Sequence, residues 1–302
     1  MSARQMKATP RPTSPARPSA KVVIGAGLAH GCETVAGGDE IVVVAGPCAV
    51  EGRDMLLQTA NSVAAAGASA LRGGAFKPRT SPFSFQGLGA HALELLAEAR
   101  QLSGLPVVTE VMDVRMLELI CAYADVVQIG ARSMQNFPLL TEVGRCDKPV
   151  LLKRGLANTL GELLAAVEYI VAGGNESIIL CERGIRSFES ATRNTLDLGA
   201  VAVLKFESHL PVFVDPSHAA GRSELVESLT LAAIAAGSDG ILVEVHPDPE
   251  TALSDGRQSL TLDSFNRLMQ RARPVARAVG RSIRGSNASV ADLAPRLAQL
   301  AT

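Results

Sequence analysis

The sequence predicts an α/β protein in which eight strand–helix units close into a (β/α)8 barrel. Short apolar, β-branched runs alternate with Ala- and Leu-rich stretches from residue 41 onward, a rhythm typical of parallel sheets. The apolar runs hold few polar residues, as expected of strands covered on both faces. The chain of 302 residues is also long enough for one barrel, which takes about 250 residues.

Eight segments have the length and composition of buried strands. They span residues 41–45, 68–71, 106–109, 126–129, 150–152, 177–180, 212–214 and 240–243. Eight units favour closure into a barrel over an open sheet.

The intervening stretches have helical patterns and helix-ending signals. Residues 55–66 end at Gly67, and glycine is a natural C-terminal cap. Thr159 and Glu162 have the spacing of a capping box, and an apolar stripe at helical spacing follows them. Further helices are expected at residues 224–236 and 263–271.

The two ends of the chain lie outside this rhythm. Residues 21–25 and 33–37 are expected to pair as a small hairpin that plugs the bottom of the barrel. Four prolines and four basic residues within residues 1–20 indicate a disordered tail rather than a targeting helix. The expected organisation is a disordered tail at 1–20, a hairpin extension at 21–40, the barrel at 41–278 and a C-terminal extension at 279–302 that carries a short helix at 290–300.

Composition excludes several classes of protein. The net charge of −1 provides no drive toward nucleic acid or membranes, and no stretch approaches the roughly 18 apolar residues of a membrane span. Aromatic residues make up only 3%, which argues against a stacking platform for single strands. The five cysteines are widely spaced, which argues against a disulfide scaffold and favours the cytoplasm.

Charged residues follow the predicted strands, where barrel enzymes hold their active sites. Seven cations converge on this rim: Arg72, Lys77, Arg79, Arg132, Lys153, Arg154 and Arg183. So many like charges at one mouth would repel one another without an anion. A substrate bearing phosphate or carboxylate groups is therefore expected, because Arg binds both in bidentate fashion.

A second group at the rim offers a thiolate, an imidazole and two carboxylates. Its members are Cys48, His218, Glu244 and Asp255. Taken singly, each has an ordinary structural explanation: a buried thiol, a loop-capping histidine, a salt bridge or a turn aspartate. Together at one rim they indicate a divalent transition-metal site, for which Mn, Fe, Co, Zn and Cu all remain open.

These rim segments resemble one family closely. They read GPCAVE at 46–51, LRGGAFKPRTSP at 71–82, QIGAR at 128–132, KRG at 153–155, CERG at 181–184, DPSH at 215–218, EVHP at 244–247 and SDG at 254–256. The chain resembles 3-deoxy-D-arabino-heptulosonate-7-phosphate (DAHP) synthases of the type I beta subfamily from about residue 22 to about residue 275. The resemblance implies a TIM barrel that condenses phosphoenolpyruvate with erythrose 4-phosphate and water, the first step of the shikimate pathway.

The resemblance also implies roles for individual residues. The metal ligands would be Cys48, His218, Glu244 and Asp255. Phosphoenolpyruvate would contact Arg72, Lys77, Glu110, Gly130, Ala131, Arg132, Lys153, Arg183 and His218. Erythrose 4-phosphate would contact Pro78, Arg79, Thr80 and Asp255. The residues expected to act in catalysis are Lys77, His218 and Cys48.

Lys77 is expected to deliver a proton to the new alkoxide, with a pKa lowered by the arginines around it; His218 and a metal-bound water are the alternative donors. The implied cofactor is a divalent metal ion, Mn2+ in the first place, with Fe2+, Co2+ or Zn2+ as alternatives. The implied partners are small-molecule substrates, a second or further copies in a homodimer or homotetramer, and a separate regulatory protein. The 20 to 40 residues ahead of the barrel are too few for the regulatory domains of many relatives.

Other functions stay open at this point. Octulosonate-8-phosphate synthases carry KANRS where this chain has KPRTS at 77–81, which favours erythrose 4-phosphate over arabinose 5-phosphate. Ser133, Gly199 and Phe206 depart from the DAHP synthase pattern and leave a modified sugar open. A Schiff-base aldolase with Lys153 as nucleophile and a non-catalytic phosphometabolite-binding regulator are further alternatives.

Overall fold

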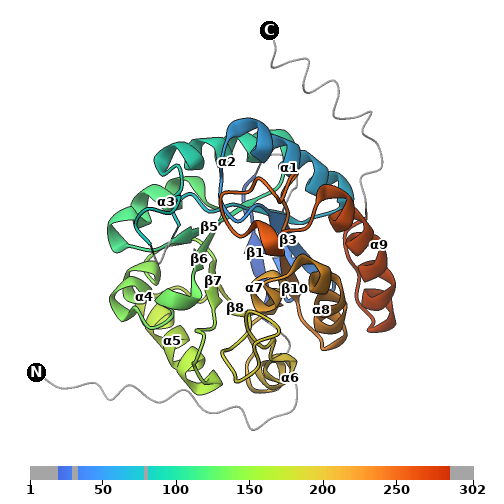
Figure 1. Cartoon of the computed structure of the whole chain (residues 1–302). Helices are drawn as coiled ribbons and strands as arrows, with labels where there is room; N and C mark the ends of the chain where they lie inside the picture. Colours follow the sequence, from blue (N-terminus) through green and yellow to red (C-terminus); the bar gives the residue numbers. More distant parts are fainter. Residues whose placement is uncertain (1–19, 29–32, 78–80, 286–302) are drawn as a thin grey trace, which may run out of the picture.

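The computed structural model describes residues 20–28, 33–77 and 81–285. Eight parallel strands close into a barrel in the order β10-β3-β4-β5-β6-β7-β8-β9, with helices around the outside (Figure 1). The strands are β3 (Val42–Gly46), β4 (Ala70–Arg72), β5 (Val107–Val111), β6 (Val126–Ile129), β7 (Val150–Lys153), β8 (Ile178–Glu182), β9 (Val212–Val214) and β10 (Gly240–Glu244). The predicted barrel is confirmed, and each predicted strand lies within two residues of an observed one.

Alternation along the strands divides the core into two parts. Val43 points outward into the layer between strands and helices, whereas Val42 and Val44 point into the barrel interior, as the two-residue period of a strand requires. The ring of Phe213 helps to fill the interior beside Gly240, where an added Cβ would lie 2.6 Å from the ring. The interior is therefore packed, and open space remains at the rim.

The helices cover the outer face of the strands. The α-helices are α1 (Arg53–Ala66), α2 (Ala90–Ser103), α3 (Leu117–Tyr123), α4 (Phe137–Val143), α5 (Leu160–Gly173), α6 (Leu198–Glu207), α7 (Pro216–Ala220), α8 (Ser223–Ala235) and α9 (Leu262–Ala278). Helix α9 is seven residues longer at its C-terminal end than the predicted 263–271. It continues past Pro274 because Ala272 and Ala276 extend its buried face. None of the helices described is long and apolar enough to cross a membrane.

The predicted caps are present. Gly67 adopts the left-handed conformation with φ 96° and ends α1. At the start of α5, Thr159 Oγ1 accepts a hydrogen bond from Glu162 N, and Thr159 N donates to Glu162 Oε2 at 2.7 Å. These bonds satisfy two backbone N–H groups that the first turn of a helix leaves without partners.

The N-terminal hairpin covers the end of the barrel opposite the rim. Strands β1 (Val22–Ile24) and β2 (Thr34–Ala36) pair antiparallel, as predicted. Val22, Ile24 and Ala36 join the interior cluster of the barrel, so the hairpin closes its bottom. Residues 1–19 and the predicted helix at 290–300 lie outside the described residues.

The capping box yields a test of the fold. Replacing Thr159 by Ala is expected to lower the free energy of unfolding by about 1 kcal/mol, because a backbone N–H at the start of α5 loses its acceptor. Thr159→Ser, which keeps the hydroxyl, serves as the control. Urea denaturation followed by circular dichroism measures both; equal losses in the two variants would contradict the capping role.

Candidate active site

The carboxyl ends of the strands surround a cavity of about 460 Å³. Its lining consists of Lys77, Ser81, Ser84, Glu110, Gly130, Ala131, Arg132, Lys153, Leu156, Arg183, Arg186, Arg193, Asn194, His218 and Asp255. Nine of these were predicted as site residues from the sequence. Among the other predicted residues, Cys48, Arg72 and Glu244 lie buried. Pro78, Arg79 and Thr80 fall outside the described residues.

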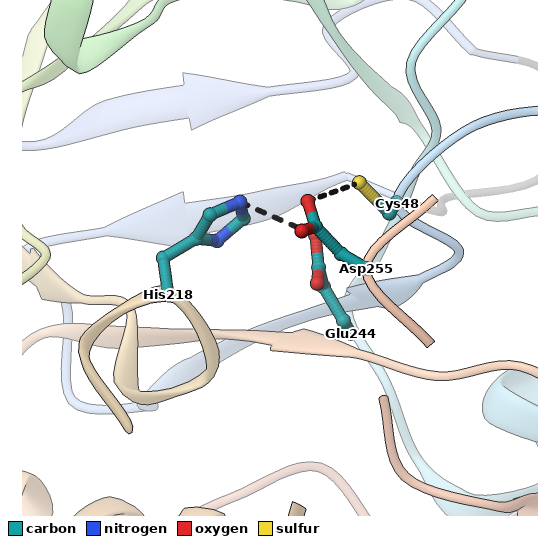
Figure 2. Close-up of side chains that lie close together, drawn as sticks. All are labelled: Cys48, His218, Glu244 and Asp255. Carbon is teal, nitrogen blue, oxygen red and sulfur yellow. Dashed lines mark hydrogen bonds and ion pairs between the residues drawn. The ribbon is translucent and has the colours of Figure 1, made fainter. Parts of the chain in front are cut away.

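Four of the predicted residues form one compact cluster beside this cavity. Cys48, His218, Glu244 and Asp255 each offer a donor atom, and these atoms all lie within 4.8 Å of one another. Figure 2 shows their side chains pointing toward a common centre. Cys48 Sγ is 3.0 Å from Asp255 Oδ2, and His218 Nε2 is 3.4 Å from Glu244 Oε1.

Each donor is placed by a different part of the barrel. Cys48 follows β3, His218 lies in α7, Glu244 ends β10, and Asp255 lies in the loop before α9. Asp255 has φ 54° and is the one non-glycine residue with a left-handed backbone in the part of the chain described. Such strain of about 1–3 kcal/mol persists where the surroundings impose it, often at functional sites.

The cluster fits a divalent metal ion in its chemistry. Burial, and then the charge of Glu244, raise the pKa of the Cys48 thiol to about 12, and burial lowers the pKa of His218. A bound cation would lower the pKa of the Cys48 thiol again, since metal ligation deprotonates a thiol. A neutral imidazole is already the ligating form of His218. The soft thiolate and hard carboxylates together suit a transition metal.

Arg72 and Arg183 point to an anion at the same site. Arg72 is buried and pairs with Glu244 Oε1 at 3.0 Å through Nη2. Its Nε and Nη1 atoms are buried without a hydrogen-bond partner among the residues described, which is costly for a charged group. Among the described residues, the Arg183 side chain donates to the carbonyl oxygens of Gly184 and His218, each at the long distance of 3.4 Å. A multiply charged anion would satisfy these donors.

Asp215 joins the cationic and metal-binding sides of the site. Its Oδ2 is 2.5 Å from Lys153 Nζ and 2.8 Å from His218 Nδ1, and its Oδ1 accepts from His218 N. Burial alone would raise the pKa of Asp215, but His218 and Lys153 outweigh it and hold the pKa well below the ordinary value. The carboxylate therefore orients both an expected substrate contact and an expected metal ligand.

Two expectations about the cations are wrong. Burial acts to lower the pKa of Lys77, but Cys48, 2.9 Å away, and Glu110 outweigh burial and raise it. The negative groups beside Lys77, Cys48 and then Glu110 and Glu244, therefore outweigh the lowering expected from the arginines. Arg154 is not a cavity cation, because it is buried in ion pairs with Glu182 and Asp197, both at 2.9 Å.

The sequence analysis missed several residues of the cavity. They are Ser81, Ser84, Leu156, Arg186, Arg193 and Asn194. Three of them lie in the 15-residue loop between β8 and α6. Arg186, Arg193 and Asn194 do not directly follow the end of a strand, and the length and polar composition of this loop are the signals in the sequence that mark it as part of a site.

The chain is similar to known proteins of one family and, more distantly, of a second kind. The model of the DAHP synthetase I family matches residues 17–278. The chain is 56% identical to a phospho-2-dehydro-3-deoxyheptonate aldolase of Thermotoga maritima, over 81% of this chain and 72% of the relative. It is 32% identical to a 2-dehydro-3-deoxyphosphooctonate aldolase of Syntrophotalea carbinolica, over 78% and 91% of the two chains.

Solved structures agree with these matches. The crystal structure of the Thermotoga maritima DAHP synthase aligns with a TM-score of 0.83 and 53% identity, over 87% of this chain and 76% of that one. A truncated form of the DAHP synthase from the same organism aligns with a TM-score of 0.79 and 49% identity, over 87% and 94% of the two chains.

The ion pairs of Asp215 yield a prediction on stability. With EDTA present, Asp215→Asn is expected to lower the free energy of unfolding at pH 7 by about 3–5 kcal/mol, because Lys153 loses its buried counter-charge and His218 Nδ1 loses an anionic partner. The depressed pKa of Asp215 means that its contribution is complete above the unfolded-state pKa of about 4 and is lost as pH falls further.

Denaturation of wild type and variant between pH 3 and pH 8 measures this difference, which should shrink at the acid end. Asp113→Asn removes a carboxylate from an exposed pair with Arg115 and is the control, with a far smaller expected effect. A pH-independent difference would contradict the role of the Asp215 charge.

Proposed function

The chain belongs to the DAHP synthetase I family, and on that premise we propose that it condenses phosphoenolpyruvate with D-erythrose 4-phosphate and water to give DAHP and phosphate. One observation carries the proposal: a single cavity of about 460 Å³ adjoins both a four-donor cluster and a set of cations. Its subfamily would be type I beta, and its place the first step of the shikimate pathway, in aromatic amino acid biosynthesis or a secondary-metabolite branch.

The four-donor cluster is the proposed metal site, with Mn2+ as the first candidate and Fe2+, Co2+ and Zn2+ as alternatives. Cys48, His218, Glu244 and Asp255 would hold the ion, and their mutual approach within 4.8 Å supports this assignment. When bound, a divalent ion supplies Lewis-acid polarisation of a carbonyl oxygen. Members of this family are in general metal-dependent, which agrees with the donor set.

The cations of the cavity are the proposed phosphoenolpyruvate site. Arg132, Lys153 and Arg183 line the cavity together and would hold the phosphate and carboxylate groups. Contacts are also assigned to Arg72, Lys77, Glu110, Gly130, Ala131 and His218. Fixing both charged groups presents the methylene carbon of phosphoenolpyruvate to the aldehyde in one orientation, which removes much of the entropic barrier of a two-substrate reaction.

Lys77 is the proposed proton donor. When the methylene carbon attacks the aldehyde carbon, the aldehyde oxygen becomes an alkoxide and takes a proton. The pKa of Lys77 is raised, so its amine is protonated at neutral pH. An alkoxide is basic enough to accept that proton. Water then adds to the former enol carbon, and phosphate leaves by C–O cleavage. His218 and Cys48 would act beside Lys77 as metal ligands.

The sugar site is assigned from the sequence. Pro78, Arg79, Thr80 and Asp255 are the proposed erythrose 4-phosphate contacts. The much higher identity to a relative named as a heptonate aldolase than to one named as an octonate aldolase supports the four-carbon sugar. A Schiff-base mechanism is disfavoured because Asp215 engages Lys153 Nζ at 2.5 Å.

The remaining proposals concern the setting of the enzyme. We propose a cytoplasmic homodimer or homotetramer in which residues 41–278 form the catalytic unit. Residues 21–40 would be a structural extension of that barrel, whereas the tail at 1–20 and the C-terminal extension at 279–302 lie mostly outside the described residues. A separate regulatory protein is a further proposed partner.

The proposed reaction is tested by phosphate release from phosphoenolpyruvate. Turnover is expected with erythrose 4-phosphate, loss of turnover with EDTA, and recovery on addition of Mn2+, because the donor cluster requires its ion. Arabinose 5-phosphate is the parallel substrate. Activity with arabinose 5-phosphate alone would move the chain to the octulosonate reaction, and activity that survives metal removal would contradict the metal site.

The role of Lys77 is tested by its removal. Lys77→Met should lower kcat by about 10²–10⁴-fold, because the alkoxide loses its proton donor while the apolar stem is kept. Lys21→Met, which changes an exposed lysine at the opposite end of the barrel, is the matched control. A Lys77→Met enzyme with native circular dichroism and a wild-type rate would rule the proton transfer out.

A further inference from the structure

Asp255 and Glu244 each direct one carboxylate oxygen toward the donor cluster and bond the other to a residue outside it. Asp255 places Oδ2 3.0 Å from Cys48 Sγ, and its Oδ1 accepts from Arg193 Nη1 at 3.1 Å. Glu244 places Oε1 3.4 Å from His218 Nε2, and its Oε2 accepts from Gln258 Nε2 at 2.6 Å. In each carboxylate, one oxygen faces the cluster and the other is held from outside it. The inner oxygen of Glu244 also pairs with Arg72 Nη2 at 3.0 Å.

The contacts of Arg193 with Asp255 and of Gln258 with Glu244 belong to one hydrogen-bond network. Arg193 Nη1 also donates to Gln258 Oε1 at 2.9 Å, so the order is Asp255–Arg193–Gln258–Glu244. Arg193 can only donate, so it requires the amide oxygen of Gln258 and turns the amide NH2 toward Glu244. If the Gln258 amide were reversed, its NH2 group would face the donor of Arg193 and its oxygen would face the carboxylate of Glu244. Neither hydrogen bond could then form. Arg193 therefore sets the orientation of Gln258.

Arg193 is itself anchored to the helix that carries His218. Its backbone N donates to Ala220 O at 3.0 Å, at the end of α7. The adjacent Asn194 donates through Nδ2 to His218 O, also at 3.0 Å. An added Cβ on Gly221 would lie 2.5 Å from Arg193 Cβ, so glycine permits this close approach. Arg193 thus spans from the segment of His218 to the loop of Asp255.

We propose that Arg193 and Gln258 are positioning residues that hold the metal-binding oxygens of Asp255 and Glu244 in place. The inference rests on the proposed metal site and adds to it two residues outside the donor set. Gln258 is buried, in the short 3-10 helix after Asp255 (Gly256–Gln258). Partners of this kind fix the orientation of ligands, and their loss commonly weakens metal binding by about 10- to 100-fold.

A direct contact with substrate is the competing role for Arg193. Its side chain lines the cavity and is 39% exposed, so an anion could reach it. The two roles differ in what they affect. A positioning residue changes metal affinity in the absence of any substrate, whereas a substrate contact changes the KM of a phosphorylated substrate and leaves metal affinity unchanged.

Metal binding by the full chain tests the proposal without an activity assay. Apoprotein prepared with EDTA is titrated with Mn2+ by isothermal calorimetry, and Co2+ loading is followed through its thiolate absorption band. Arg193→Ala and Gln258→Met are each expected to weaken Mn2+ binding by about 10- to 100-fold and to shift the Co2+ band. Arg193→Lys should recover part of the affinity, because it keeps a donor near Asp255.

The double variant and a matched control complete the design. Arg193→Ala with Gln258→Met should weaken binding by less than the product of the two single effects, because both act through one chain. Arg145→Ala removes an arginine from an exposed pair with Glu142 and should bind Mn2+ as wild type does. Unchanged circular dichroism and thermal midpoint in EDTA establish that the variants fold.

The outcomes separate this inference from the proposed function. Wild-type protein that fails to bind Mn2+ or Co2+ would overturn both. Tight binding by wild type and equally tight binding by Arg193→Ala and Gln258→Met would overturn the positioning role alone. A raised KM for erythrose 4-phosphate with unchanged metal affinity would assign Arg193 to substrate instead.

Discussion

The structure at the rim of this barrel depends on ion pairs between buried charged side chains. Asp215 is fully buried and meets Lys153 at 2.5 Å and His218 at 2.8 Å, and Arg72 meets Glu244 at 3.0 Å. An unpaired charge at any of these positions would be strongly destabilising. The same pairs hold cations beside the donor cluster: Lys153 is linked to His218 through Asp215, and Arg72 contacts Glu244. The requirement to neutralise buried charge therefore also arranges the site.

Some groups at the rim are left without a full set of partners, and the ligands of the proposed reaction would supply them. Arg72 keeps two buried nitrogens without hydrogen-bond partners among the residues described, and burial and Glu244 raise the pKa of Cys48 to about 12. An anion would satisfy the first group and a divalent cation the second. The interior of the barrel is packed and the hairpin covers its opposite end, so both ligands would bind at the rim.

Much of the fold and part of the site followed from local pattern. The eight strands and the cap of α5 were predictable because continuous apolar, β-branched runs and the Thr159–Glu162 spacing are properties of neighbouring residues. The donor residues were predictable because strand ends meet at one rim. The prediction that arginines lower the pKa of Lys77 was wrong because Cys48 and Glu110 lie beside it, and spacing along the chain does not reveal such neighbours.

Patterns within the sequence were enough to predict the order of strands and helices, the polarity of the rim, the family and the four residues of the donor cluster. The tertiary structure set how these groups meet: Arg193 reaches Asp255 across 62 residues of sequence, and Cys48 reaches it across 207. It also decided that Arg154 pairs inside the protein with Glu182 and Asp197. The physical reason is that charge interactions depend on distance in space and on burial, which only the closed barrel sets.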